Sequence, residues 1–261
     1  LRCFEDGDVT HVEGCVDPLA DADVVDTELM LSDLEVLEKR EANLRKKATT
    51  KDKYAIAELE LVNLALAELQ AGRPARCADI PKGRERDFKN LQLITAKPVI
   101  YVCNVEEESA ADGNSLSARV AEKAAAEGAQ AVIISARIEE ELAQLDDGER
   151  LEYLDTLGLT EPGLNRLIRQ GYDLLELITY FTAGPKEARA WTIRRGTPAP
   201  QAAGVIHTDF ERGFIRAETI GYEDYTKLNG EQGARDAGRL RQEGKDYVVQ
   251  DGDVMLFRFN V

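Results

Sequence analysis

The first ninety residues carry apolar positions at the spacing of α-helices. Two stripes recur at intervals of three or four residues: Leu34, Leu37, Glu41 and Leu44, then Tyr54, Ala57, Leu61 and Leu64. The polar segment 48–52 separates the stripes, so we expect two antiparallel helices of about five turns each, packed as a coiled-coil hairpin. Pro74 ends the second helix because proline cannot continue it. Residues 5–26 are predicted as a polar loop.

Two short apolar runs, 99–103 and 131–134, are typical of strands buried in a parallel sheet. Helical patterns follow over 117–127, 138–145, 149–157 and 162–174, and this alternation predicts an α/β layer. With a strand ending at 1–4, about three strands are present, too few for a self-sufficient doubly wound sheet. The chain starts at Leu1 without a signal segment, so we expect its front half to be missing.

After residue 178 the pattern changes to short β segments separated by turns. The expected strands are 189–193, 207–209, 214–219, 247–249 and 254–259, with a tight turn at 251–253. They predict a small mixed sheet of β-grasp topology, crossed by a helix or loop over 230–244. We therefore expect an α/β portion (1–25 and 91–177), a helical insertion (26–90) and a C-terminal domain (178–261).

Charge and cysteine usage narrow the classes of function. The 261 residues carry a net charge of −16, which disfavours general attraction to nucleic acid or anionic lipid, and we expect no DNA sequence recognition. Residues 178–261 hold 12 basic and 12 acidic residues, so the whole excess lies in residues 1–177. No apolar run approaches the roughly 20 residues of a membrane-spanning helix. Cys3, Cys15, Cys77 and Cys103 lack metal-binding spacing, so we expect buried thiols in a reducing cytoplasm.

The turn after the first buried strand carries the clearest candidate chemistry. Ligands of open α/β sheets bind outside the carboxyl ends of strands, where Asn104 and Glu107 follow one strand and residues 135–137 the next. An asparagine side chain both donates and accepts, and a carboxylate accepts a hydrogen bond from a base N–H. Asparagine and glutamate are also common in ordinary loops, so a nucleotide site and a chance loop both stay open.

Short sequence motifs along the whole chain resemble those of the YchF family of Obg-like P-loop ATPases. They occupy residues 2–5, 11–14, 16–18, 26–29, 33–35, 95–98, 145–147, 180–184, 189–192, 199–204, 206–210, 244–247 and 251–254. The most specific are YFTAG at 180–184, RAWT at 189–192 and IHTDF at 206–210. The resemblance implies a G domain with a coiled-coil insertion. It also implies a C-terminal TGS domain, a β-grasp module of translation-linked proteins.

The resemblance also implies which residues hold the nucleotide. The base loop of ordinary GTPases reads Asn-Lys-x-Asp, whereas Val105 and Glu107 stand at the lysine and aspartate positions, which implies a preference for ATP over GTP. The next purine-contacting loop corresponds to Ser135, Ala136 and Arg137. Phe4 resembles the residue that stacks on adenine; from the residues alone, a core position is the simpler interpretation.

His11 is the catalytic residue that the resemblance implies. These ATPases lack the glutamine that orients the attacking water in GTPases, and a histidine in this loop is the candidate substitute. By its spacing alone, His11 is a surface residue among acids. The sequence contains no G-x-x-x-x-G-K-[ST] phosphate loop. We therefore expect the phosphate cradle and the Mg²⁺ ligands before Leu1, no metal ligand within the chain, and no ATP turnover by this chain alone.

Two functions stay open from the sequence. The first is an ATP hydrolase acting as a ribosome-, translation- or stress-linked switch. The second is an adaptor that contacts ribosome or RNA through the C-terminal domain and keeps a non-catalytic pocket. Its basic and aromatic residues are Arg189, Arg194, Arg195, Arg212 and Arg216, with Trp191, Phe210 and Phe214. The opposing interpretation places these aromatics in the sheet's core and the arginines on a solvated face.

Overall fold

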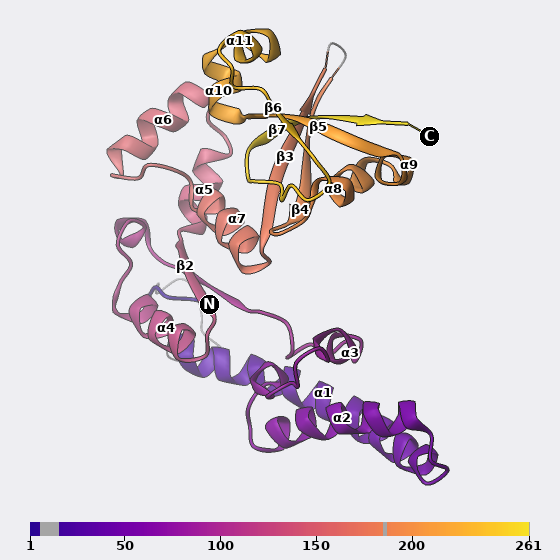
Figure 1. The fold of residues 1–261 in the computed structure, drawn as a ribbon. Helices are drawn as coiled ribbons and strands as arrows, with labels where there is room; N and C mark the ends of the chain where they lie inside the picture. The colour runs from indigo at the N-terminus through magenta and orange to yellow at the C-terminus, as the bar shows by residue number, and fades with distance from the viewer. Residues whose placement is uncertain (6–15, 185–186, 261) are drawn as a thin grey trace. The chain divides into compact units, whose positions relative to one another are not determined.

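A computed structural model describes residues 1–5, 16–184 and 187–260 of the chain. The chain divides into two units, Leu1–Gln170 and Gly171–Val261 (Figure 1). Of the helices in these described ranges, none is both long and apolar enough to cross a membrane. His11, to which the sequence assigns catalysis, lies outside the described residues.

The first unit contains the expected helical hairpin, formed by α1 (Pro18–Ala48) and α2 (Lys53–Gln70). The Asp17 side chain accepts a 3.1 Å hydrogen bond from the Leu19 N–H, and a proline suits the first helical turn, so α1 begins at Pro18. The predictions of a polar loop up to Asp26 and of a five-turn first helix are therefore wrong, since α1 has 31 residues.

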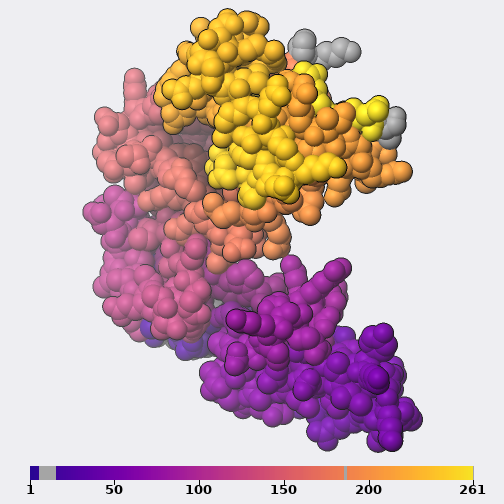
Figure 2. All heavy atoms as spheres, viewed as in Figure 1, coloured from indigo at the N-terminus to yellow at the C-terminus, as the bar shows by residue number. Residues whose placement is uncertain are grey.

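The buried face of α2 differs from the predicted stripe. Its buried residues are Ala55, Leu61, Val62, Ala65, Leu66 and Leu69. Tyr54, placed on the stripe by sequence, is 89% exposed. The reason is a third packing partner, because Phe88 of α3 (Glu85–Lys89) and the apolar residues after it join the same core as α1 and α2. Figure 2 shows the purple residues of α1, α2 and α3 as one packed lobe.

The α/β layer of this unit has β1 (Ile100–Asn104) and β2 (Gln130–Ile134) paired in parallel, as predicted. α4 (Ser115–Ala126) connects them and ends before Gly128, whose φ of 66° suits glycine. Arg2 forms a parallel bridge with Asn104, so the chain start occupies a third strand position. The remaining helices are η1 (Ala75–Cys77), η2 (Glu107–Ser109), α5 (Ala136–Leu142), α6 (Asp147–Thr156) and α7 (Gly163–Leu174).

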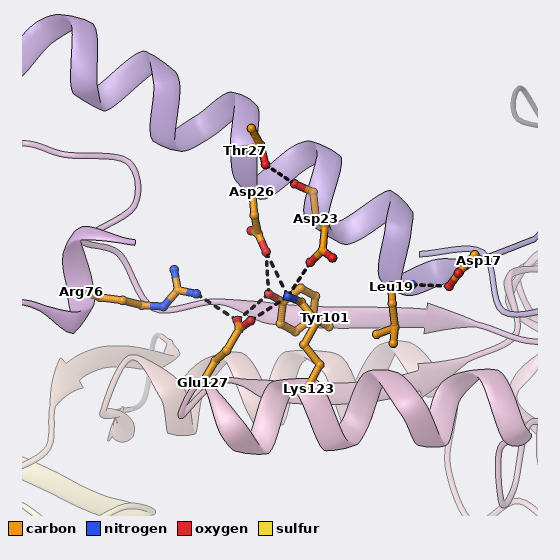
Figure 3. A network of polar contacts seen from close by, with 9 residues as sticks. All are labelled: Asp17, Leu19, Asp23, Asp26, Thr27, Arg76, Tyr101, Lys123 and Glu127. Atoms are coloured by element: carbon orange, nitrogen blue, oxygen red, sulfur yellow. Dashed lines mark hydrogen bonds and ion pairs between the residues drawn. The ribbon is translucent and has the colours of Figure 1, made fainter. Parts of the chain in front are cut away.

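A polar network fixes the start of α1 against β1 and α4 (Figure 3). Lys123 on α4 pairs with Asp23 on α1 at 2.9 Å and with Glu127 at 2.7 Å. The Tyr101 hydroxyl of β1 donates toward Glu127 at 2.8 Å and toward Asp26 at 3.1 Å. Burial and these carboxylates raise the pKa of Tyr101, so the phenol stays protonated. The network borders a cavity of about 220 Å³ whose charged groups pair with one another.

The second unit is a five-stranded mixed sheet in the order β4-β3-β7-β5-β6. Its strands are β3 (Leu177–Ala183), β4 (Ala188–Arg194), β5 (Phe214–Gly221), β6 (Arg241–Glu243) and β7 (Asp253–Phe259). Its helices are α8 (Ala199–Ile206), α9 (Thr208–Arg212), α10 (Tyr222–Lys227) and α11 (Glu231–Asp236). Tyr180 lies fully buried in the core, and its hydroxyl donates to the Ala202 carbonyl of α8 at 2.9 Å.

Two predicted strands of this unit are wrong, and two observed strands, β3 and β6, were not predicted. β6 lies within 230–244, where a helix or loop was expected, and α11 occupies the earlier part of that segment. Residues 207–209 form no strand, because the His207 Nδ1 accepts a 3.2 Å hydrogen bond from the Asp209 N–H and caps α9. The 247–249 segment makes only an isolated bridge, between Val248 and Pro198. β3 was not predicted, although its Ile-Thr-Tyr-Phe run has strong strand propensity, and it pairs with both β4 and β7.

The prediction of buried thiols holds for two cysteines and is wrong for a third, and Cys15 lies outside the described residues. Cys3 and Cys103 are buried, whereas Cys77 is exposed at the end of η1. A hydrogen bond with Cys103, followed by burial, raises the pKa of the Cys3 thiol and keeps it protonated. Such thiols are poor nucleophiles.

Candidate nucleotide site

A cavity of about 670 Å³ opens beyond the carboxyl ends of β1 and β2, within the size range of ligand sites. Its lining contains all seven residues that the sequence assigned to nucleotide binding: Phe4, Asn104, Val105, Glu107, Ser135, Ala136 and Arg137. The structure therefore brings together three segments that are well separated along the chain.

Asn104 joins the two loops of the site. Its Oδ1 accepts a 2.9 Å hydrogen bond from the Ala136 N–H, which ties the end of β1 to the start of α5. The buried Val105 donates its N–H to the Ile134 carbonyl at 2.9 Å, so the loops are also held through their backbones. Among the described residues the Asn104 amide nitrogen makes no hydrogen bond. It is therefore free to donate to a ligand.

Glu107 faces Arg137 across the mouth of the cavity, with the Arg137 Nε 2.6 Å from the Glu107 Oε1. The Arg137 side chain is 76% exposed, so salt and water screen this pair. The other charged residues of the lining are all acidic: Glu5, Glu106, Glu108 and Glu140. This excess of negative charge repels phosphate groups and attracts hydrogen-bond donors of a base.

Phe4 lies at the edge of this cavity rather than in the core. Its ring is half-buried, and the Arg2 guanidinium lies 4.8 Å from the ring centroid. The neighbouring Cys3 fills the core position instead. The Ser135 hydroxyl is buried without a hydrogen-bond partner among the described residues. An aromatic ring, a free amide and an orphaned hydroxyl in one cavity fit a purine base.

Sequence reasoning missed two residues of this site, Glu106 and Asn114. The Asn114 side chain caps α4 by accepting from the Leu116 and Ser117 N–H groups, each at 3.0 Å. Its Nδ2 donates to the Cys3 carbonyl at 2.6 Å and lies 3.1 Å from a Glu106 carboxylate oxygen. A hydrogen bond from Ser109, helped by Asn114, lowers the pKa of Glu106. The Asn-x-x-Ser cap pattern at 114–117 was the signal for the helix start.

Comparisons with known proteins identify relatives of this chain. The family model YchF-GTPase_C, described as "Protein of unknown function (DUF933)", matches residues 177–260. A protein of Haemophilus influenzae named "Ribosome-binding ATPase YchF" is 52% identical over 261 residues, which cover all of this chain and 72% of that protein. A Bacillus subtilis protein with the same name is 47% identical over 263 residues, with the same coverage.

This chain belongs to the YchF family. The solved structure of the Schizosaccharomyces pombe YchF GTPase superimposes with a TM-score of 0.84 at 35% identity, covering 98% of this chain and 70% of that one. A GTP-binding protein from Pyrococcus horikoshii, at 19% identity and a TM-score of 0.58, shares the fold. The α/β fold and the relation to nucleotide-binding YchF proteins are thereby confirmed.

Within residues 1–5, 16–184 and 187–260, no three or more His, Cys, Asp or Glu side chains converge as metal ligands do. The position of the Mg²⁺ ligands before Leu1 stays a prediction.

Proposed function

We propose that this YchF protein binds ATP in preference to GTP and hydrolyses it, as a cytoplasmic switch linked to ribosomes and translation. The observation that carries the proposal is the bond between Asn104 and Ala136, which places a free amide donor beside a carboxylate-rich wall. The adenine amino group is a donor where guanine has a carbonyl oxygen. At that position of the ring, a carboxylate attracts the adenine amino group and repels the guanine carbonyl oxygen.

In this proposal different lining residues contact different parts of the nucleotide. Phe4 stacks on the base, a contact worth about 1–3 kcal/mol in single-stranded nucleic-acid complexes. Asn104 donates to a ring nitrogen, and the Glu107–Arg137 pair closes the side of the pocket. The five glutamates of the lining keep the phosphates away from this end. A phosphate-binding part outside the described residues supplies the rest, and ATP brings Mg²⁺ as its usual counter-ion.

The proposal predicts that the base loop sets nucleotide preference. In full-length protein, Val105→Lys combined with Glu107→Asp restores the guanine-reading residue types and shifts preference toward GTP by at least about 10-fold. Competition binding of ATP and GTP measures the ratio. Glu122→Asp, at an exposed position of α4 outside the cavity lining, is the matched control and leaves the ratio unchanged. An unaltered ATP preference in the double variant would remove these two positions from base recognition.

His11 carries the second prediction of the proposal, as the residue that orients the attacking water. His11→Ala in full-length protein leaves ATP affinity within a few-fold and lowers turnover by about 10²-fold or more. Single-turnover hydrolysis and equilibrium binding are measured on one preparation. Unchanged hydrolysis returns His11 to a surface role, and a parallel loss of binding makes it a ligand contact.

We further propose that α1 and α2 form the family's coiled-coil insertion and that the second unit is its TGS domain, which carries the ribosome contact. The alternative, an RNA-binding adaptor with a non-catalytic pocket, rests on the arginines and aromatics of this unit. Phe214 is 5% exposed and belongs to the core, and Phe210 is partly buried against that core and stacks on Phe259 at 3.9 Å. ATP binding without hydrolysis by full-length protein would favour the adaptor.

A further inference from the structure

Among the residues that the structure describes, one edge of the sheet in the second unit has no partner strand. β4 is the first strand in the order of this sheet, and within the same residues it pairs only with β3, through all seven of its residues. The other edge strand, β6, has only three residues. Long unpaired edges are uncommon in stable folds, because they attract other strands.

The hydrogen-bond alternation identifies which groups of β4 point outward. Two bonds flank its ladder with β3: Gly184 N–H to the Glu187 carbonyl at 2.9 Å, and Arg195 N–H to the Glu176 carbonyl at 2.7 Å. In an antiparallel pair, hydrogen-bonded positions recur every second residue. Arg189, Trp191 and Ile193 therefore bond to β3, and the N–H and C=O groups of Ala188, Ala190 and Thr192 point away from the sheet.

These outward positions are open to an added strand. Ala188, Ala190 and Thr192 are all exposed and have small side chains. In the described part of the chain, the backbone N–H and C=O groups of these three residues form no hydrogen bond with another backbone group. An extended polypeptide satisfies both the N–H and the C=O groups of such an edge, whereas RNA phosphates satisfy only the N–H groups. The edge therefore suits a peptide strand better than an RNA.

The charge of the edge determines the kind of peptide. Residues 188–195 contain Arg189, Arg194 and Arg195 and no acidic residue. The Arg189 guanidinium stacks 4.2 Å from the Trp191 ring, whose Nε1 donates to the Thr182 Oγ1 at 2.9 Å. Arg194 has no ion pair within the described ranges. A second copy of β4 would bring six arginines together, so self-pairing is disfavoured.

We propose that the β4 edge is a docking surface for an extended, acidic polypeptide segment, which adds as a sixth strand. Its backbone pairs with Ala188, Ala190 and Thr192. Its carboxylates lie beside Arg189 on one face of the sheet and beside Arg194 on the other, because strand side chains alternate between the two faces. The proposal goes beyond the nucleotide-dependent function and does not depend on it, since every group involved belongs to the second unit.

The experiment uses the 261-residue chain and a defined probe, the peptide Glu-Glu-Val-Thr-Val-Glu-Glu-amide, with fluorescein on its N-terminal amine and glutamates on both faces of the strand. Fluorescence anisotropy measures its affinity, and amide hydrogen exchange maps its position. We expect new protection of the outward amides at Ala190 and Thr192, with little change at Trp191, whose amide already bonds to β3. A probe with N-methyl groups along one edge, and a probe with lysine in place of glutamate, should each bind at least 10-fold more weakly.

Two variants test the edge itself. Ala190→Pro removes one outward N–H that the native sheet does not use, and edge strands tolerate proline. It should weaken binding at least 10-fold, whereas Ala190→Ser, which keeps the N–H, should bind as the unaltered chain does. If Ala190→Pro fails to fold, Arg189→Glu combined with Arg194→Glu replaces it, with the same expected loss.

Four outcomes would overturn the proposal. They are equal binding of the N-methylated probe, equal binding of the lysine probe, and protection of the same amides by polyuridylate instead of by the peptide. The fourth is a concentration-dependent dimer that Ala190→Pro abolishes, because it would assign the edge to a second copy of the chain.

Discussion

At the scale of single residues, Asn114 connects three segments beside the candidate nucleotide site. Its Oδ1 caps α4, and its Nδ2 reaches the Cys3 carbonyl beside Phe4 and the Glu106 carboxylate beside Glu107. One amide thus holds the aromatic wall and the base loop at a fixed separation. Only an asparagine or glutamine side chain offers an acceptor and a two-proton donor together.

The Asn114 side chain therefore has two roles, capping α4 and bridging to Cys3 and Glu106, and two variants separate them. Asn114→Ser keeps a cap oxygen and loses the bridge, whereas Asn114→Ala loses both. We expect Asn114→Ala to be less stable than Asn114→Ser by about 1 kcal/mol, the usual value of a helix cap. Both variants should weaken ATP binding by full-length protein. Urea denaturation and nucleotide titration measure the two effects, and equal stability of the variants would contradict the capping role.

At the scale of elements, β5 and β7 are joined by a buried carboxylate. Glu218 on β5 is 8% exposed and lies 3.0 Å from the Arg258 guanidinium of β7, with Arg216 at 3.6 Å. Arg258 is the main cause that lowers the pKa of Glu218. A buried carboxylate between two arginines stabilises the fold only while it is ionised.

This arrangement predicts a pH-dependent stability. The pKa of Glu218 in the folded state lies below its value in the unfolded state, which is about 4.3. The contribution of Glu218 to the free energy of unfolding is therefore complete above about pH 4.3 and is lost as the pH falls through the lowered pKa. The difference in Tm between the unaltered chain and Glu218→Gln should therefore be large at pH 7 and shrink below about pH 4. Glu187→Gln, an exposed position in the same unit, is the control. A pH-independent difference would contradict the ion-pair account.

At the scale of the whole chain, the apolar cores follow the division into two units. The core around Tyr180, Met255 and Phe257 contains residues of the second unit alone. The three other apolar clusters are built from residues of the first unit alone. Each unit thus buries its own apolar surface, which is the requirement for independent folding.

We therefore predict that residues 171–261 fold without the rest of the chain. Thermal unfolding followed by circular dichroism should show one cooperative transition. A shorter piece starting at Ile178 removes Leu177, the first residue of β3, and should melt at a lower temperature. A gradual, non-cooperative loss of signal in the longer piece would contradict the division into units.

Local signals in the sequence were enough to predict the helical hairpin, the strands at β1 and β2, and most of the small sheet. These elements depend on periodicity and turn residues, which act over a few positions. The sequence also predicted that Asn104 and Ser135 lie close together, because the carboxyl ends of parallel strands meet at one edge of a sheet, and the family resemblance added Phe4 to the same cavity. Their role in nucleotide binding stays a prediction.

Only the tertiary structure decided which face of α2 is buried, that Asn114 bonds to Cys3 across 111 positions, and that the β4 edge lacks a partner. Each of these depends on what packs beside a residue from a distant part of the chain. Tyr54 has the right spacing for a core position, yet α1 and α3 bury the neighbouring face, because burial depends on all packing partners at once. Sequence spacing describes one element at a time and contains no such information.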